Sequence, residues 1–149
     1  MFCYILDNNA SIQQAIHEIE QQQGLKSFMV KAKKAGNHIP NGENTDDYVK
    51  PSADKWIRAF VDAEIVFTDS FHGTVFSIIF NKPFWVIGNK ERGNARFDSL
   101  LKQFNLESRR IDVSEINDIN LLEPVDWVKV NSIKKEWQTK SVKFIKDNL

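Results

Sequence analysis

The chain is poor in several features, and each shortage excludes a class of protein. Among its 149 residues Cys3 is the only cysteine, so no disulfide can form within the chain, as in many proteins of reducing compartments. Lys plus Arg and Asp plus Glu both number 20, so the chain lacks the positive charge that non-specific nucleic-acid binding requires. No apolar run approaches the roughly 20 residues of a membrane span, and the N-terminus does not resemble a signal peptide. We therefore expect a soluble, cytoplasmic protein that binds no nucleic acid.

Core-forming residues are plentiful by contrast. The hydrophobic content is 42%, with 11 Phe and 4 Trp, and 149 residues suit one domain of ordinary size. We therefore expect residues 1–149 to form a single domain, with Cys3 in its core. An apolar run begins almost at the first residue, which indicates that this domain is part of a larger protein.

Short apolar runs alternate with segments of helical periodicity. The apolar runs predict strands at 2–6, 27–30, 64–68 and 84–87. The periodic segments predict helices at 11–23, from 52 onwards, at 71–80, at 97–104 and near the C-terminus, with a long loop at 33–50. Because the strands are apolar on both sides, we expect a mostly parallel sheet covered by helices on both faces, a Rossmann-like α/β domain.

Helix ends and apolar stripes can also be predicted. Ser11 and Ser52 are expected to be N-caps, and Gly24 is expected to end the first helix with positive φ. A buried stripe is expected at Trp56, Ile57, Phe60 and Val61. A C-terminal helix that lies back across the domain is indicated by Ile133, Trp137, Phe144 and Ile145. Arg109 and Arg110 are expected to be solvated, with a contact from either one back to a carboxylate on the core as the alternative.

Polar residues gather where the strand at 64–68 meets the helix at 71–80, and α/β proteins bind anions at such junctions. Ser70 is expected to cap the helix, its first N–H groups are expected to face a cleft, and Gly73 is expected to let a ligand approach closely. An equally weighted alternative is structural: Thr68, Asp69 and Ser70 only end the strand and cap the helix.

His72 is the candidate acid at this junction. A lone histidine is more often structural than catalytic. A helix N-terminus disfavours the imidazolium, whereas a bound anion favours it, so His72 could donate a proton once an anionic substrate is present. His17 and His38 have no neighbours at metal-ligand spacing, and we expect no metal site.

Loops that follow parallel strands share one edge of the sheet, so the segments 7–11, 68–74 and 88–96 should converge. The last segment carries three cations that suit contacts with phosphate or carboxylate, with solvated surface charge as the alternative. The candidate residues for binding an anionic donor or its phosphate are therefore Thr68, Asp69, Ser70, Gly73, Thr74, Lys90, Arg92 and Arg96.

The segment 68–77 reads T-D-S-F-H-G-T-V-F-S and is followed by N-K-P-F at 81–84. With these motifs the chain resembles the C-terminal half of the polysaccharide pyruvyl transferase family. The resemblance extends more loosely over 2–7, P-S-x-x-x-W at 51–56, R-G-x-x-R-F at 92–97 and the closing Asp126-Trp127 and helix. It therefore covers most of the chain.

The resemblance implies a fold similar to the C-terminal half of the GT-B glycosyltransferases, facing an N-terminal domain that this chain lacks. Members of the family transfer an enolpyruvyl unit from phosphoenolpyruvate to two hydroxyls of a sugar. The product is a pyruvate ketal on a bacterial exopolysaccharide or capsule, or on its lipid-linked precursor, which would bring the enzyme to a membrane surface. Phosphoenolpyruvate is the donor substrate, and no cofactor is implied. His72 would be the general acid, and Arg92 and Arg96 would hold donor charges.

One position departs from the family pattern. Many members carry an arginine two residues before the histidine, where this chain has Ser70. Either Arg92 or Arg96 replaces that contact, or this branch uses another donor. A glycosyltransferase-like domain that holds a nucleotide sugar at 70–74 therefore stays open, as does a non-catalytic carbohydrate-binding module.

Overall fold

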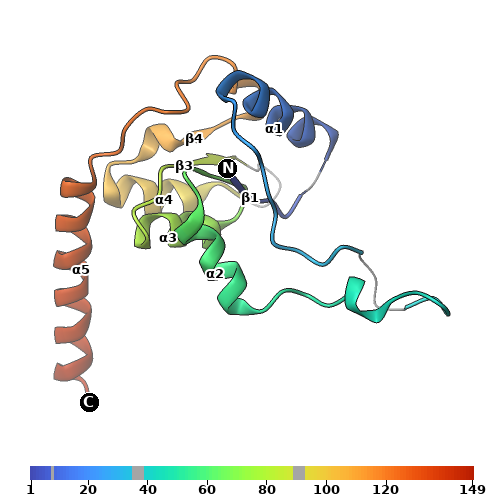
Figure 1. Cartoon of the computed structure of the whole chain (residues 1–149). Coiled ribbons are helices and arrows are strands. Elements are labelled where there is room, and N and C mark those ends of the chain that lie inside the picture. Colours follow the sequence, from blue (N-terminus) through green and yellow to red (C-terminus); the bar gives the residue numbers. More distant parts are fainter. Residues whose placement is uncertain (8, 35–38, 89–92) are drawn as a thin grey trace.

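The computed structural model describes residues 1–7, 9–34, 39–88 and 93–149. Within these residues, four parallel strands form one sheet in the order β1-β2-β3-β4, with helices on both faces (Figure 1). The strands are β1 (Phe2–Tyr4), β2 (Val66–Thr68), β3 (Phe84–Ile87) and β4 (Arg110–Ile111). The α-helices are α1 (Ala10–Gln23), α2 (Ala53–Asp62), α3 (Phe71–Ile79), α4 (Ala95–Phe104) and α5 (Trp127–Asp147). The 3-10 turns are η1 (Thr45–Asp47), η2 (Glu107–Arg109) and η3 (Val113–Glu115). The expected Rossmann-like α/β arrangement is confirmed.

Alternate residues of each strand enter two cores, one on each face of the sheet. Cys3, Phe67 and Trp85 align across β1, β2 and β3 and pack beneath α1. The residue before each of them packs on the other face, beneath α2, α3 and α4. Full burial of a large apolar side chain stabilises a fold by about 1.5–3 kcal/mol. The parallel strands are therefore held from both sides, as their apolar sequences predict.

Helix α1 begins at an asparagine cap and ends at a glycine. Asn9 Oδ1 accepts a hydrogen bond from Ile12 N at 3.0 Å, so Asn9 is the N-cap and the prediction of Ser11 was wrong. Both residue types suit this position, and the sequence alone does not choose between them. Gly24 has φ 63°, in the left-handed region that the prediction requires.

Helix α2 packs on the sheet beside β1 through a narrow face. Phe60 is fully buried and its ring meets that of Phe2 at 4.9 Å. Ile57 and Val61 are 37% and 42% exposed, so the predicted stripe was wrong for both. The helix meets the core along one line, and its flanking apolar residues stay outside. Ser52 occupies the N-cap, although its side chain makes no capping hydrogen bond.

Three further expectations differ from the structure. Residues 27–30 make one bridge, between Phe2 and Phe28, rather than a strand. The strand β4 was not predicted, because the sequence around it shows no clear period. Arg96 lies in the first turn of α4 and not in the preceding loop.

Arg109 is buried rather than solvated, with 2% of its surface exposed. Its guanidinium lies 4.8 Å from the centroid of a Trp85 ring, and Nη2 donates to the carbonyls of Glu123 and Pro124 at 2.9 and 3.0 Å. Burial lowers the pKa of Arg109 from its ordinary value. The arginine therefore fixes the chain that follows β4 to the α1 face of the sheet.

Helix α5 projects from the rest of the molecule (Figure 1). Val130 is buried and Ile133 packs against the core, but further along the helix Trp137, Phe144 and Ile145 are 46%, 70% and 54% exposed. The prediction that this helix lies back across the domain was wrong. None of the described helices is long and apolar enough to cross a membrane.

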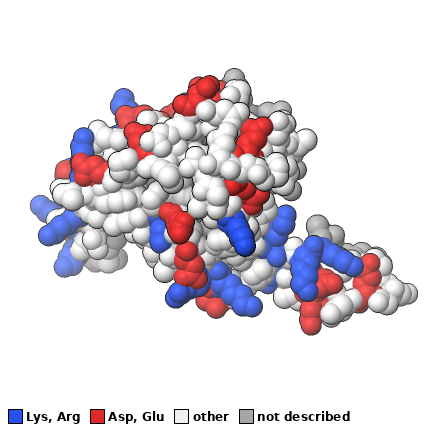
Figure 2. All heavy atoms as spheres, turned by 45° about the horizontal axis from the view of Figure 1, so that its top comes forward, with Lys and Arg blue, Asp and Glu red and all other residues white. Residues whose placement is uncertain are grey.

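Charges of both signs are interspersed on the face shown in Figure 2. The segment between α1 and α2 forms the lobe at the right of this view, and ion pairs join its described parts. Lys33 lies 2.9 Å from Asp47, and Lys34 lies 2.8 Å from Glu43.

Candidate active site

Thr68 joins the end of β2 to the end of β1. Its hydroxyl donates to the carbonyl oxygen of Tyr4 at 2.6 Å and accepts from Ser70 N at 3.1 Å. Gly73 lies directly against it, and a Cβ on Gly73 would stand 2.3 Å from Thr68 Oγ1. The space beside Gly73 is therefore filled by Thr68, which gives this glycine a packing role.

Asp69 fixes the loop that follows β1. Its two carboxylate oxygens accept from the backbone N–H groups of Leu6 and Asp7, at 2.7 and 2.8 Å. Hydrogen bonds to a carboxylate are the stronger kind, worth about 1.5–3 kcal/mol each. This contact therefore brings the segments after β1 and β2 together at the carboxyl edge of the sheet, as the parallel topology predicts.

Ser70 and Thr74 complete the first turn of α3. Ser70 Oγ accepts from Gly73 N at 3.5 Å, so the predicted capping role of Ser70 is confirmed. Thr74 Oγ1 donates back to the Ser70 carbonyl at 3.1 Å. Thr68, Asp69, Ser70 and Thr74 are at most 3% exposed, and each polar side chain has a protein partner. The structural alternative is therefore favoured for these four residues.

His72, in contrast, is exposed at the start of α3 and lines a cavity of about 490 Å³. The cavity lies beyond the carboxyl end of β1, between the N-termini of α2 and α3. Its lining consists of Tyr4, Val30, Lys31, Lys50, Pro51, Ala53, Trp56 and His72. Among these residue types, histidine is the one that most often serves as a general acid or base.

The lining of this cavity suits an anion. Lys31 and Lys50 are exposed and supply two ammonium groups, with no carboxylate in the lining. Trp56 adds an apolar wall, and its indole N–H is buried without a hydrogen-bond partner in the described part of the chain. Buried N–H groups are rarely left unpaired. A negatively charged ligand with oxygen acceptors would pair with both lysines.

Arg96 and His72 both contact Phe71. The guanidinium of Arg96 is 5.6 Å from the centroid of the Phe71 ring, and the centroid of the His72 ring is 6.2 Å from it. Arg96 also lines a neighbouring hollow of about 370 Å³. The start of α4 therefore approaches the start of α3, as the convergence of their loops predicts. Lys90 and Arg92 lie outside the described residues.

Lys31 and Lys50 were not identified from the sequence. Both lie in the long segment between α1 and α2, which has no periodicity to place its residues in space. The one available signal was the position of Lys50 immediately before the Pro51-Ser52 start of α2. Among residues 1–7, 9–34, 39–88 and 93–149, no three His, Cys, Asp or Glu side chains gather into a group that could hold a metal ion.

The family model for polysaccharide pyruvyl transferase matches residues 3–91. The chain belongs to this family. No curated protein and no solved structure significantly matches the chain. The match covers well over half of the polysaccharide pyruvyl transferase domain described here, which agrees with the resemblance carried by the T-D-S-F-H-G-T-V-F-S segment.

The matched range contains every residue that lines the cavity at His72. Arg96, β4 and α5 lie beyond it. In this member of the polysaccharide pyruvyl transferase family, the part of the sequence that matches the family model therefore includes the buried turn and the cationic cavity.

Proposed function

We propose that this chain supplies the donor-binding half of an enzyme that forms pyruvate ketals on a polysaccharide or its precursor sugar. The donor is phosphoenolpyruvate, bound in the cavity at His72. The observation that carries the proposal is the cavity lining itself, in which one histidine and two lysines line the same hollow. Phosphoenolpyruvate carries a phosphate and a carboxylate, so two cations in one lining match its two charged groups.

Lys31 and Lys50 take over the role that an arginine two residues before the histidine plays in many family members. Ser70 occupies that position here, and its hydroxyl already caps α3. Arg96 contacts the Phe71 ring and adds to the positive charge around the site. The donor is therefore held from the segment between α1 and α2, with α4 contributing at its margin.

His72 acts as the general acid. A dianionic donor beside the imidazole favours its protonated form. His72 passes this proton to the methylene carbon of phosphoenolpyruvate, which leaves an oxocarbenium-like centre at C2. A sugar hydroxyl adds to C2 and loses its proton, phosphate leaves with the C–O bonding pair, and a second hydroxyl adds and loses its proton. The products are a cyclic ketal and inorganic phosphate.

The acceptor is bound by a facing domain, as in two-domain transferases whose sites lie between domains. The exposed apolar residues of α5 and the open mouth of the cavity support such an arrangement. We expect the enzyme to work in the cytoplasm, where a lipid-linked acceptor would bring it to the membrane surface.

The test is a titration of the His72 imidazole by NMR with phosphoenolpyruvate and, separately, with uridine diphosphate. We expect a saturable shift with phosphoenolpyruvate. The Lys31→Ala and Lys50→Ala double variant should weaken that binding by roughly tenfold or more. Lys55→Ala is the matched control, because Lys55 is an exposed lysine of α2 that does not line the cavity.

Three other outcomes of the titration would contradict the proposal. A response to uridine diphosphate alone would replace pyruvyl transfer with a nucleotide-sugar reaction. A response to neither ligand would show that this cavity does not bind the donor. If Lys55→Ala weakened phosphoenolpyruvate binding equally, Lys31 and Lys50 would act only through the overall charge of the protein and not by direct contact.

A further inference from the structure

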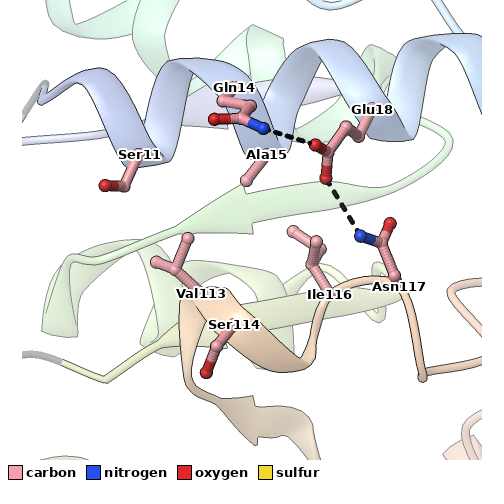
Figure 3. Close-up of a pocket in the computed structure, with 8 residues that line it drawn as sticks. All are labelled: Ser11, Gln14, Ala15, Glu18, Val113, Ser114, Ile116 and Asn117. Carbon is pink, nitrogen blue, oxygen red and sulfur yellow. Dashed lines mark hydrogen bonds between the residues drawn. The ribbon is translucent and has the colours of Figure 1, made fainter.

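A second cavity lies on the α1 face of the sheet, between α1 and the turn η3 (Figure 3). Its volume is about 460 Å³. One face of α1 forms one wall, and the chain after β4 forms the other. The lining residues are Ser11, Gln14, Ala15, Glu18, Val113, Ser114, Ile116 and Asn117.

The chemistry of this groove differs from that of the cavity at His72. Two hydroxyls, two amides and one carboxylate line it, and it has no lysine or arginine. A phosphate or carboxylate would meet Glu18 without a cation to neutralise it, which disfavours anions. Ala15 and Ile116, which are 2% and 3% exposed, form an apolar floor. Acceptors and donors above an apolar floor suit an uncharged ring with many hydroxyls.

Glu18 organises the polar wall. Its Oε1 accepts from Gln14 Nε2 at 2.9 Å and its Oε2 accepts from Asn117 Nδ2 at 3.2 Å, as Figure 3 shows. A carboxylate has about four acceptor positions, so roughly two remain for a ligand. Asn117 is itself fixed, because its Oδ1 accepts from Gln22 Nε2 at 2.8 Å. The carboxylate is therefore oriented before any ligand arrives.

Both walls are anchored to the fold. Ala15 is part of the buried face of α1. The turn η3 begins with a reciprocal capping box, in which Asp112 N donates to Glu115 Oε2 at 2.7 Å. A preformed site loses less entropy on binding than a flexible one. The groove is therefore built to receive a ligand with little rearrangement.

We propose that this groove binds one uncharged sugar residue of the polysaccharide. The proposal rests on the proposed function for its ligand class, since it deepens what is said of the acceptor. The CH face of a pyranose packs on Ala15 and Ile116, and its hydroxyls donate to Glu18 and exchange hydrogen bonds with Ser11 and Ser114. Ser11 and Ser114 follow the carboxyl ends of β1 and β4, the sheet edge at which His72 also lies. The groove thus extends acceptor recognition beyond the donor cavity.

The test uses amide chemical shifts of the whole chain with three probes: methyl β-D-glucopyranoside, methyl β-D-galactopyranoside and methyl α-D-mannopyranoside. We expect at least one glycoside to cause saturable shifts confined to residues 11–18 and 113–117. Glu18→Ala should weaken that binding by roughly tenfold. Gln21→Ala is the matched control, because Gln21 is an exposed residue of α1 outside the groove, and it should leave the affinity unchanged. Retained dispersion of the spectrum shows that each variant is folded.

The opposite results would overturn the proposal. These are the absence of saturable shifts with all three glycosides, equal binding by Glu18→Ala, or saturation of the groove by inorganic phosphate. The outcome is separable from that of the donor titration. Glycoside binding without a phosphoenolpyruvate response at His72 would support the sugar groove and contradict the proposed donor site. The reverse result would support the donor site and contradict the sugar groove.

Discussion

At Gly73 the first turn of α3 passes so close to Thr68 that no side chain fits between them. A Cβ would lie 2.3 Å from Thr68 Oγ1, which is itself bound to the Tyr4 carbonyl. We predict that Gly73→Ala lowers the free energy of unfolding by roughly 1–3 kcal/mol, since overpacking would displace Thr68 and its hydrogen bond. Urea denaturation of the variant measures this loss.

A double-mutant cycle isolates this contact. On a Thr68→Ala background the clashing hydroxyl is gone, so Gly73→Ala should cost less than it does in the wild-type chain. Additive losses in the double variant would locate the strain elsewhere in the turn.

Cys3 tests the burial of β1. Desolvation raises the pKa of its thiol to about 12, and the thiol is buried between the sheet and α1. We predict that the folded chain reacts far more slowly with a thiol reagent at pH 8 than the chain in urea, because only the thiolate attacks. In the unfolded chain the thiol titrates near pH 8.5. The stabilisation that comes from keeping Cys3 protonated in the fold is therefore complete below that pH, and it is lost as the pH rises towards the folded pKa. Rapid reaction of the native protein would contradict the buried position.

His72 is predicted to affect the rate more than donor binding. In the enzyme formed with its facing domain, His72→Ala should lower the catalytic rate by roughly 100-fold or more, because proton transfer to carbon loses its acid. The dissociation constant for phosphoenolpyruvate should change little, since the two lysines remain. His17→Ala, at an exposed position of α1, is the control and should keep the rate. An unchanged rate in His72→Ala would remove His72 from the mechanism.

Among the elements, α5 is attached by a lysine in addition to its packed residues Val130 and Ile133. Lys134 Nζ donates to the carbonyls of Ile78 and Ile79 at 3.0 and 3.3 Å and to Asn81 Oδ1 at 2.7 Å. Burial lowers the pKa of this lysine, and its three hydrogen bonds join α5 to the end of α3. We predict that Lys134→Ala lowers the free energy of unfolding by about 1–3 kcal/mol and speeds amide exchange in α5.

Lys140→Ala provides the matched control for this helix. Lys140 pairs with Glu136 at 2.6 Å on an exposed face, and exposed pairs four residues apart contribute about 0.3–0.5 kcal/mol. Exchange in the first two turns of α5 should therefore stay slow in this variant. Similar losses in both variants would mean that Lys134 does not anchor the helix.

The sequence predicts an element well where its residues are buried on both faces of the sheet and the residues that flank it mark its ends. β3 was predicted at its observed bounds because all four residues are apolar and Pro83 and Gly88 flank them. β4 has two residues and exists only through its pairing with β3, so no local pattern marks it. The stripe on α5 correctly indicates an apolar face. It does not indicate that the face continues past the core, because periodicity carries no information about what lies opposite.

For the molecule as a whole, the parts of the site that depend on local sequence were predicted, and the parts that depend on distant residues were not. His72 and the buried turn lie in one continuous segment, so the residues around them could be read together. Asp69 holds backbone groups 62 and 63 residues away, and this partner could not be chosen from local sequence. Lys31 and Lys50 reach the cavity only through the path of the segment between α1 and α2. The sequence therefore indicates which residues have suitable chemistry, but not which residues far apart in the chain lie together in the fold.

The open cavity leads to a prediction about the entire chain. In the proposed function the acceptor and half of the positioning groups come from a facing domain, so this chain alone would not hold the reacting atoms in line. We predict that this chain alone binds phosphoenolpyruvate but releases no measurable phosphate from it in the presence of acceptor sugars. A coupled phosphate assay measures the rate, and the two-domain enzyme serves as the positive control. Full turnover by the isolated chain would show that the cavity at His72 is already complete, because catalysis would then need no groups beyond those of this domain.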